Sequence, residues 1–129
     1  DITLFVDCNE DISIKIYSRE LLQVIINLLK NAKEAFENKN IKDKRIEVVV
    51  KSFTSYIRIE MFDNAGAIDD AIKDRIFEPY FSTKDEQMGT GLGLYMSKTI
   101  IEKHLGGKLW YENKKDGVSF YIDLPINYK

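Results

Sequence analysis

Two asparagines one helical turn apart are the first residues in this chain whose type and spacing suggest chemistry. Asn27 and Asn31 belong to the stretch NLLKNAKEAF, residues 27–36. Side chains four residues apart share one face of a helix, and amide oxygens are ligands that suit Mg²⁺. The alternative is that both lie at the helix margin and bond to solvent or a loop, because a buried amide without a partner costs about 1–3 kcal/mol.

A carboxylate, Asp63, ends an apolar run and begins the stretch DNAGAI, residues 63–68. The preceding alternation places Ile57, Ile59 and Met61 on one face of a strand, and Asp63 continues that inward face. A buried carboxylate needs a hydrogen-bond donor, which the exocyclic amine of adenine would supply. Taken by itself, however, the stretch favours an Asx-turn, which requires no ligand.

Three glycines stand at alternate positions in GTGLGL, residues 89–94, directly before a helical run. Glycines there allow close approach of the backbone, and a helix N-terminus offers unpaired N–H groups and partial positive charge to a phosphate. The spacing matches neither a dinucleotide-binding fingerprint nor a Walker loop. A flexible hinge explains the regular spacing poorly, so this stretch is the most specific local signal in the chain.

The stretch IFEPYFSTK, residues 76–84, combines an aromatic cluster with a Ser-Thr-Lys loop. Phe77, Tyr80 and Phe81 would form the cluster, and Lys84 would be able to reach a phosphate. A surface loop pinned by aromatic side chains is the alternative, and the segment alone does not decide between them.

The elements that must position these residues follow from hydrophobic periodicity and turn signals. Helices are predicted at 18–38 and 89–105, with a short one at 69–77. Strands are predicted at 2–7, 12–17, 45–53, 56–62, 108–113 and 117–124. Strands and helices do not alternate regularly, which favours an α+β fold with helices on one face of a largely antiparallel sheet. No repeat or linker divides the chain, so we expect one domain over 1–129.

Composition restricts the class of protein. Apolar residues make up 44% and charged residues 31% of 129 residues, as in an ordinary globular domain. A net charge of −2 argues against nucleic acid or an anionic membrane as the main partner. The single cysteine, Cys8, lies in an apolar run and is expected to be buried. No apolar stretch is long enough to cross a bilayer, and a start at Asp1 suggests a piece of a longer protein.

Taken in order, these stretches resemble the conserved boxes of sensor histidine kinases. Residues 27–35 resemble the N box, 63–68 the first glycine box, 76–84 the F box and 89–94 the second glycine box. The resemblance covers the chain from about residue 15 to its end. It implies the ATP-binding catalytic module of a two-component kinase, a two-layer α/β sandwich (Bergerat fold). In that fold, shared with type II topoisomerases, heat-shock chaperone ATPases and mismatch-repair ATPases, about three helices cover one face of a mostly antiparallel sheet.

The resemblance also implies roles for individual residues, with ATP and Mg²⁺ as cofactors. Asn31 would hold Mg²⁺, Asn27 would line the same wall and, with Lys84, serve the transfer step, and Asp63 would read the adenine amine. Ala65 and Ala67 stand where the first glycine box has glycines. The remaining nucleotide contacts would come from Ile68, Ile76, Phe81, Lys84, Gly89, Thr90, Gly91, Leu92, Gly93 and Leu94.

The implied reaction is transfer of the γ-phosphoryl group to a histidine on the kinase's own dimerisation domain, which is missing from this chain. Related ATPases carry a glutamate at the place of Asn27, and asparagine cannot act as that base, so hydrolysis is disfavoured. His104, the only histidine, is expected to end a helix rather than accept phosphate. The resemblance implies a downstream response regulator and a cytoplasmic location, whether or not the rest of the protein is anchored in a membrane.

Two alternatives stay open at this point. Ala67 favours a degenerate nucleotide-binding or scaffolding module with little or no kinase activity. A serine kinase of the anti-sigma-factor kind, which shares the fold, is the other alternative.

Overall fold

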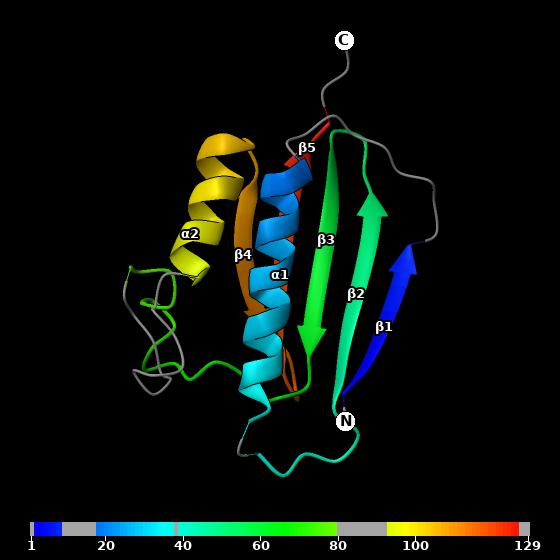
Figure 1. The fold of residues 1–129 in the computed structure, drawn as a ribbon, viewed down its shortest axis with the longest axis vertical. Coiled ribbons are helices and arrows are strands. Elements are labelled where there is room, and N and C mark those ends of the chain that lie inside the picture. The colour runs from blue at the N-terminus through cyan, green and yellow to red at the C-terminus, as the bar shows by residue number, and fades with distance from the viewer. Residues whose placement is uncertain (1, 9–17, 38, 80–92, 127–129) are drawn as a thin grey trace.

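The computed structural model describes residues 2–8, 18–37, 39–79 and 93–126, which form a five-stranded sheet with helices on one face (Figure 1). The strands are β1 (Thr3–Cys8), β2 (Arg45–Ser52), β3 (Tyr56–Asp63), β4 (Lys108–Asn113) and β5 (Val118–Pro125). The helices are α1 (Ser18–Ala35) and α2 (Gly93–Thr99), which continues without interruption into the π-helix η1 (Ile100–His104).

The sheet has the strand order β1-β2-β3-β5-β4. β1 pairs with β2 in parallel, and the other three pairs are antiparallel. The predicted α+β architecture and the mostly antiparallel sheet are therefore confirmed. The described residues form two helical segments on the covered face, where about three helices were predicted.

The core lies between the central strands and α1. Alternation in β3 turns Ile57, Ile59, Met61 and Asp63 inward, as predicted, and each is buried. On α1, Val24, Leu28 and Ala32 recur at steps of four and are buried against them. Because the apolar face of the helix matches the inward face of the strand, α1 lies along β3 and places its C-terminal half near the end of that strand (Figure 1).

The prediction of a short helix at residues 69–77 is wrong. Successive turns occupy this region, with N–H groups of Ile72, Arg75 and Glu78 donating to carbonyls three residues back. The Asp69 carboxylate accepts a hydrogen bond from the Ala71 N–H at 3.0 Å. That bond is of the kind that caps a helix N-terminus, but the backbone bonds that follow each span three residues and recur only at every third residue, so they close separate turns in place of a helix.

The other element predictions fare better. β4 matches its predicted bounds, and β5 is shifted by one residue. The second long helix is present over its described part, but its last turn widens, with the Leu105 N–H donating to the Ile100 carbonyl at 3.0 Å. The strand predicted at 12–17 lies outside the described residues.

β1 is an edge strand, and all six of its residues are exposed. Cys8 is among them, so the prediction that its side chain is buried is wrong. An edge strand has a neighbour on one side only, and the helices cover the central strands rather than β1 (Figure 1). Within the described residues, no helix combines the length and the apolar character needed to cross a bilayer.

Candidate functional site

The described members of the predicted site gather at one end of the sandwich. Asn27 and Asn31 lie in the C-terminal half of α1, Asp63 is the last residue of β3, and Gly93 begins α2. In Figure 1 the segment that follows β3 runs beneath the end of α1 toward the side of the molecule where α2 begins. Three elements far apart in the sequence therefore meet there.

Asp63 is a nearly buried carboxylate with spare hydrogen-bonding capacity. It is 5% exposed, and the Ala65 N–H donates to its Oδ1 at 3.1 Å. Burial raises the pKa of Asp63 to about 6, although the Ala65 N–H and the charge of Lys39 both pull the pKa down. A carboxylate accepts about four hydrogen bonds, and the described residues supply one, so this group suits an amine donor from a ligand.

The segment after Asp63 is held at both ends by asparagine side chains. Asn64 accepts a hydrogen bond from the Arg45 N–H at 2.8 Å and donates to the Asp43 carbonyl at 3.0 Å. At the other end, Asn113 accepts from the Ile68 N–H at 2.8 Å and donates to the Ile68 carbonyl at 3.0 Å. We call residues 63–68 the recognition loop; its ends are fixed to the start of β2 and the end of β4.

The middle of the recognition loop turns at Gly66, not at either alanine. Gly66 has φ +107°, a conformation that suits glycine, and among the described residues the only non-glycine with positive φ is Asp43. The Ala65 side chain is 2% exposed and packs into the core, whereas Ala67 is exposed. Lys39 donates to the Ala65 carbonyl at 2.6 Å. Ala67 therefore carries no left-handed backbone strain.

Gly117, at the end of the turn between β4 and β5, lies against the backbone of Asp63. A Cβ added at Gly117 would stand 1.8 Å from the Asp63 carbonyl oxygen. This close approach keeps the end of β3 in register with the start of β5, where Asp63 pairs with Val118.

The two asparagines face α2. Asn27 donates to the Ser97 hydroxyl at 3.4 Å and accepts from the Gln23 amide at 3.2 Å. Asn31 lies next to the start of α2, where a Cβ added at Gly93 would be 4.0 Å from its Nδ2. Asn27 thus joins the two helices, and Asn31 is the closer of the two to the glycine-bearing end of α2.

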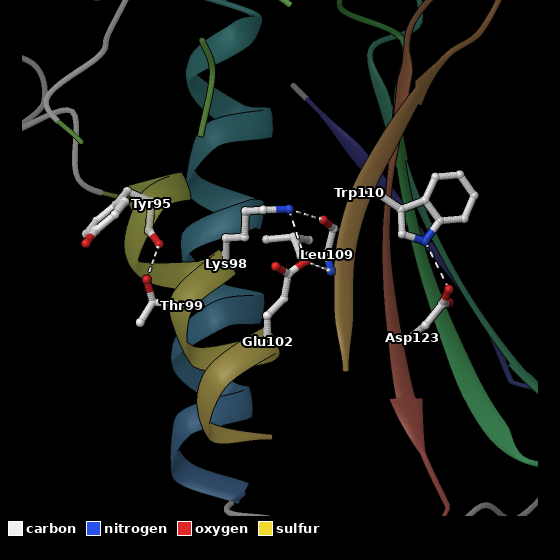
Figure 2. A network of polar contacts seen from close by, with 7 residues as sticks. All are labelled: Tyr95, Lys98, Thr99, Glu102, Leu109, Trp110 and Asp123. Atoms are coloured by element: carbon white, nitrogen blue, oxygen red, sulfur yellow. Dashed lines mark hydrogen bonds and ion pairs between the residues drawn. The ribbon is translucent and has the colours of Figure 1, made fainter. Parts of the chain in front are cut away.

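α2 is fixed to the sheet by an ion pair that also bonds backbone, as Figure 2 shows. Lys98 donates to Glu102 at 3.0 Å and to the Leu109 carbonyl at 3.1 Å, while Glu102 accepts from the Leu109 N–H at 3.2 Å. Because both side chains bond the backbone of β4, the helix keeps its position, and with it the position of Gly93, relative to the strands.

Other predicted residues are placed less directly. Ile76 is buried and Ile68 half-buried, and Leu94 packs against the main core cluster. Phe77 packs with Tyr111 and Phe120 of the sheet. Six predicted site residues lie outside the described ranges: Phe81, Lys84, Gly89, Thr90, Gly91 and Leu92.

His104 lies at the end of η1, as predicted, with its Nδ1 2.7 Å from Glu20 in the first turn of α1. Glu20 and Asn31 are separated along α1 by about 16 Å at 1.5 Å per residue. The only histidine is therefore remote from the candidate site.

Sequence reasoning missed four residues that shape the site: Lys39, Ser97, Asn113 and Gly117. Each lies outside the chemically suggestive stretches, and each acts through a contact between segments distant in sequence. Gly117 ends the stretch KKDG before β5, and nothing in that stretch indicates its contact with Asp63.

This chain is similar in sequence to one family of ATPase domains and to sensor proteins that contain such a domain. The family model described as "Histidine kinase-, DNA gyrase B-, and HSP90-like ATPase" matches residues 16–128. The two-component sensor PprA of Pseudomonas aeruginosa is 39% identical over 110 residues, covering 83% of this chain and 12% of that protein. Sensor protein FixL of Bradyrhizobium diazoefficiens is 36% identical over 110 residues, covering 82% and 20% respectively. The chain thus spans a fifth or less of these relatives.

Solved structures of a histidine kinase have the same fold as this chain. The catalytic domain of histidine kinase ThkA, in a nucleotide-free form, matches with a TM-score of 0.84 at 32% identity, over 97% of this chain and 80% of that one. ThkA in complex with the response regulator TrrA matches with a TM-score of 0.79 at 27% identity, over 98% of this chain and 34% of that one.

Proposed function

Because the chain belongs to the family of histidine kinase-, DNA gyrase B- and HSP90-like ATPases, we propose that it binds Mg-ATP and supplies the γ-phosphoryl group to a histidine on a separate domain of its parent kinase. Its relatives are sensor kinases of two-component systems. The observation that carries the proposal is Asp63, a buried carboxylate left with acceptor capacity at the end of a strand.

The residues present fit an adenine nucleotide. The Asp63 carboxylate would accept a hydrogen bond from the exocyclic amine, which guanine lacks at that position, and so would discriminate between the purines. Ile68 and Ile76 would provide apolar contacts to the base, and Ala67 lies exposed on the recognition loop. Phe81 is proposed as a further apolar contact from the sequence resemblance.

The donor set also fits Mg²⁺ bound together with phosphates. Within the described ranges, no cluster of three or more His, Cys, Asp or Glu side chains is placed to hold a metal by itself. Asn31 would contribute an amide oxygen, and when bound the ion would neutralise phosphate charge. Lys84 and the glycines of the second glycine box, with Thr90, Leu92 and Leu94, are proposed to face the phosphates.

Transfer is favoured over hydrolysis by the identity of Asn27. Its amide oxygen accepts from Gln23 and its nitrogen donates to Ser97, so the side chain is engaged in a contact between helices. An amide has no basic group with which to activate water, so catalysis would rest on positioning and electrostatics.

The acceptor domain needs a surface to dock on, and the two helices offer one. Leu22 and Ile26 on α1, and Tyr95 and Met96 on α2, are large apolar side chains that are 39–55% exposed. We propose that the parent's dimerisation domain, which bears the histidine, covers them. A response regulator is the expected downstream partner, as in the complex solved for ThkA, and the cytoplasm, where ATP is abundant, is the expected location.

Thermal unfolding with and without nucleotide tests the proposal. Mg-ATP at 100 times its Kd should raise the stability of the domain by about 2.7 kcal/mol, and Mg-GTP should have much less effect. Asn31→Ala should remove most of the Mg²⁺-dependent part of the stabilisation. No shift with millimolar Mg-ATP would exclude an active kinase and favour the degenerate module, whereas transfer to serine rather than histidine would favour the anti-sigma-factor alternative.

A further inference from the structure

Lys39 lies in the segment between α1 and β2, outside all four stretches that identify the family. Its ammonium nevertheless reaches the recognition loop and donates to the Ala65 carbonyl at 2.6 Å. A Cβ added at Gly66 would be 3.6 Å from the same nitrogen. The lysine thus lies directly on the turn that follows Asp63.

This contact fixes the residue whose N–H bonds the candidate adenine-reading carboxylate. Ala65 donates through its N–H to Asp63 and accepts through its carbonyl from Lys39, and its methyl group is buried in the core. Gly66 then reverses the chain with positive φ. Ala65 is therefore held on three sides, and Lys39 supplies the one of these contacts that comes from a charged side chain.

We propose that Lys39 is a positioning residue for nucleotide recognition: by holding the Ala65 carbonyl, its ammonium keeps the Ala65 N–H on the Asp63 carboxylate and sets the loop in its binding conformation. This inference rests on the proposed function of the site. It adds a residue that acts through Ala65 and Asp63, without contact with the nucleotide itself.

The charge of Lys39 acts in the same direction as its hydrogen bond. The residues paired with Asp63 on the neighbouring strands are Ile46 and Val118, both apolar, and the adjacent turn contributes Gly117. Among the described residues, Lys39 is the one charged side chain that lowers the pKa of Asp63. Without it, less of the carboxylate would be ionised near neutral pH, and the ionised form is the better acceptor for an amine.

Two variants separate this role from simple structural support. Lys39→Met removes the charge and the donor while keeping a long side chain, and Lys39→Arg keeps both. Lys42→Met, a loss of charge at an exposed lysine in the same segment, is the matched control. Thermal unfolding of all three checks that each variant is folded.

The first measurement needs no nucleotide. Carboxyl ¹³C NMR titration of the free domain should show the pKa of Asp63 raised by about half a pH unit or more in Lys39→Met. In Lys39→Arg and Lys42→Met it should stay at the wild-type value. An unchanged pKa in Lys39→Met would overturn the proposal.

The second measurement is the Kd for Mg-ATP between pH 5.5 and 8. Lys39→Met should bind about fivefold more weakly at pH 6.5, a difference of about 1 kcal/mol. A half-unit rise in the pKa of Asp63 accounts for about 1.5-fold of this loss through lower ionisation, a part that should disappear by pH 8. The rest reflects the loss of loop positioning and should remain at every pH. Lys39→Arg should restore the profile. Wild-type affinity in Lys39→Met at every pH would overturn the proposal. Failure of the wild-type domain to bind would refute the proposed function instead, and the NMR titration would then decide alone whether Lys39 holds the loop.

Discussion

Two aspartates on opposite faces of the same sheet have very different surroundings. Asp63, on the face covered by the helices, is 5% exposed and receives one hydrogen bond from the described residues, from a backbone N–H. Asp123, on the open face, receives three: from Arg58 at 2.8 and 3.1 Å and from Trp110 at 3.0 Å. The Trp110 bond is visible in Figure 2.

The group around Asp123 is complete without a ligand. The Arg58 guanidinium makes a two-pronged ion pair with Asp123 and lies 5.0–5.7 Å from the ring centroids of Phe53, Tyr56, Trp110 and Tyr121. The hydrogen bond to Asp123 is the main cause that raises the pKa of Arg58. A hollow of about 350 Å³ on this face is lined by Arg45, Glu47 and Glu60 among others, and these charges too have partners within the chain.

The comparison suggests that the number of hydrogen-bond donors, more than burial alone, separates a structural carboxylate from a candidate recognition group. Asp123 has its lone pairs engaged and can gain little from a ligand. Asp63 has lost water without gaining an equal number of partners, so a ligand amine would relieve a cost that the fold already bears.

The largest expected effect is on the Kd for Mg-ATP, when an aspartate is replaced by asparagine on one face of the sheet or on the other. Asp63→Asn should weaken Mg-ATP binding about 100-fold, because it replaces a charged acceptor with a neutral amide. Asp123→Asn should leave the Kd within about twofold of wild type, since its contacts are internal to the sheet. Isothermal titration calorimetry of both variants measures these Kd values. Similar Kd values for the two variants would show that Asp63 contributes no more to nucleotide binding than Asp123 does.

The second-largest effect is expected in how the free energy of unfolding depends on pH, to which the Asp63 carboxylate should contribute. The pKa of Asp63 is about 6 in the folded state and near 3.8 when exposed. The folded domain binds the proton more tightly, so stability falls as pH rises from about 4 to 6, by up to roughly 2–3 kcal/mol. Asp63→Asn should therefore be more stable than wild type at pH 7 and similar at pH 4. Chemical unfolding at both pH values tests this, and equal stability at pH 7 would show that Asp63 carries no burial cost.

On the open face the corresponding substitution, Asp123→Asn, is expected to lower stability, by a smaller amount than the change expected at Asp63. The variant leaves Arg58 facing an amide NH₂ group in a partly buried setting, which should cost about 1–2 kcal/mol. The measurement is the free energy of unfolding in urea at pH 7, with Lys103→Met, at an exposed position of η1 remote from Arg58, as the reference substitution. A loss below about 0.5 kcal/mol would mean that the ion pair is too solvated to matter.

The smallest effect is expected at Ala67. Because this residue is exposed and has no positive φ, its methyl group affects the nucleotide by proximity alone. Ala67→Gly should tighten Mg-ATP binding two- to threefold, or by about 0.5 kcal/mol. Equal or weaker binding would show that the site is built around alanine.

The sequence predicted the five strands that the structure describes, α1, the described part of the second long helix and the inward direction of Asp63, because local periodicity determines those features. It failed at residues 69–77, where backbone hydrogen bonds between residues three apart close separate turns instead of a helix. It failed again at Cys8, because the apolar pattern of β1 does not reveal that the strand lies at the edge of the sheet.

Four motifs in order identified the family, and their residues converge in space as far as the structure describes them. The positioning residues could not be predicted in this way. Lys39 and Ala65 are 26 residues apart, and Asn113 and Ile68 are 45 apart. Such contacts depend on how the folded sheet brings distant segments together, so no local pattern in the sequence predicts them.

The close approach of Gly117 to Asp63 has a consequence for how this domain can evolve. Any side chain at residue 117 would have to displace the backbone that carries Asp63. In a saturation mutagenesis library, position 117 should therefore tolerate as few amino acids as position 63, although it lies in a hairpin turn and has no side chain to take part in chemistry. Natural variation in the hairpin should accordingly be confined to its preceding residues, with the glycine inherited together with the aspartate.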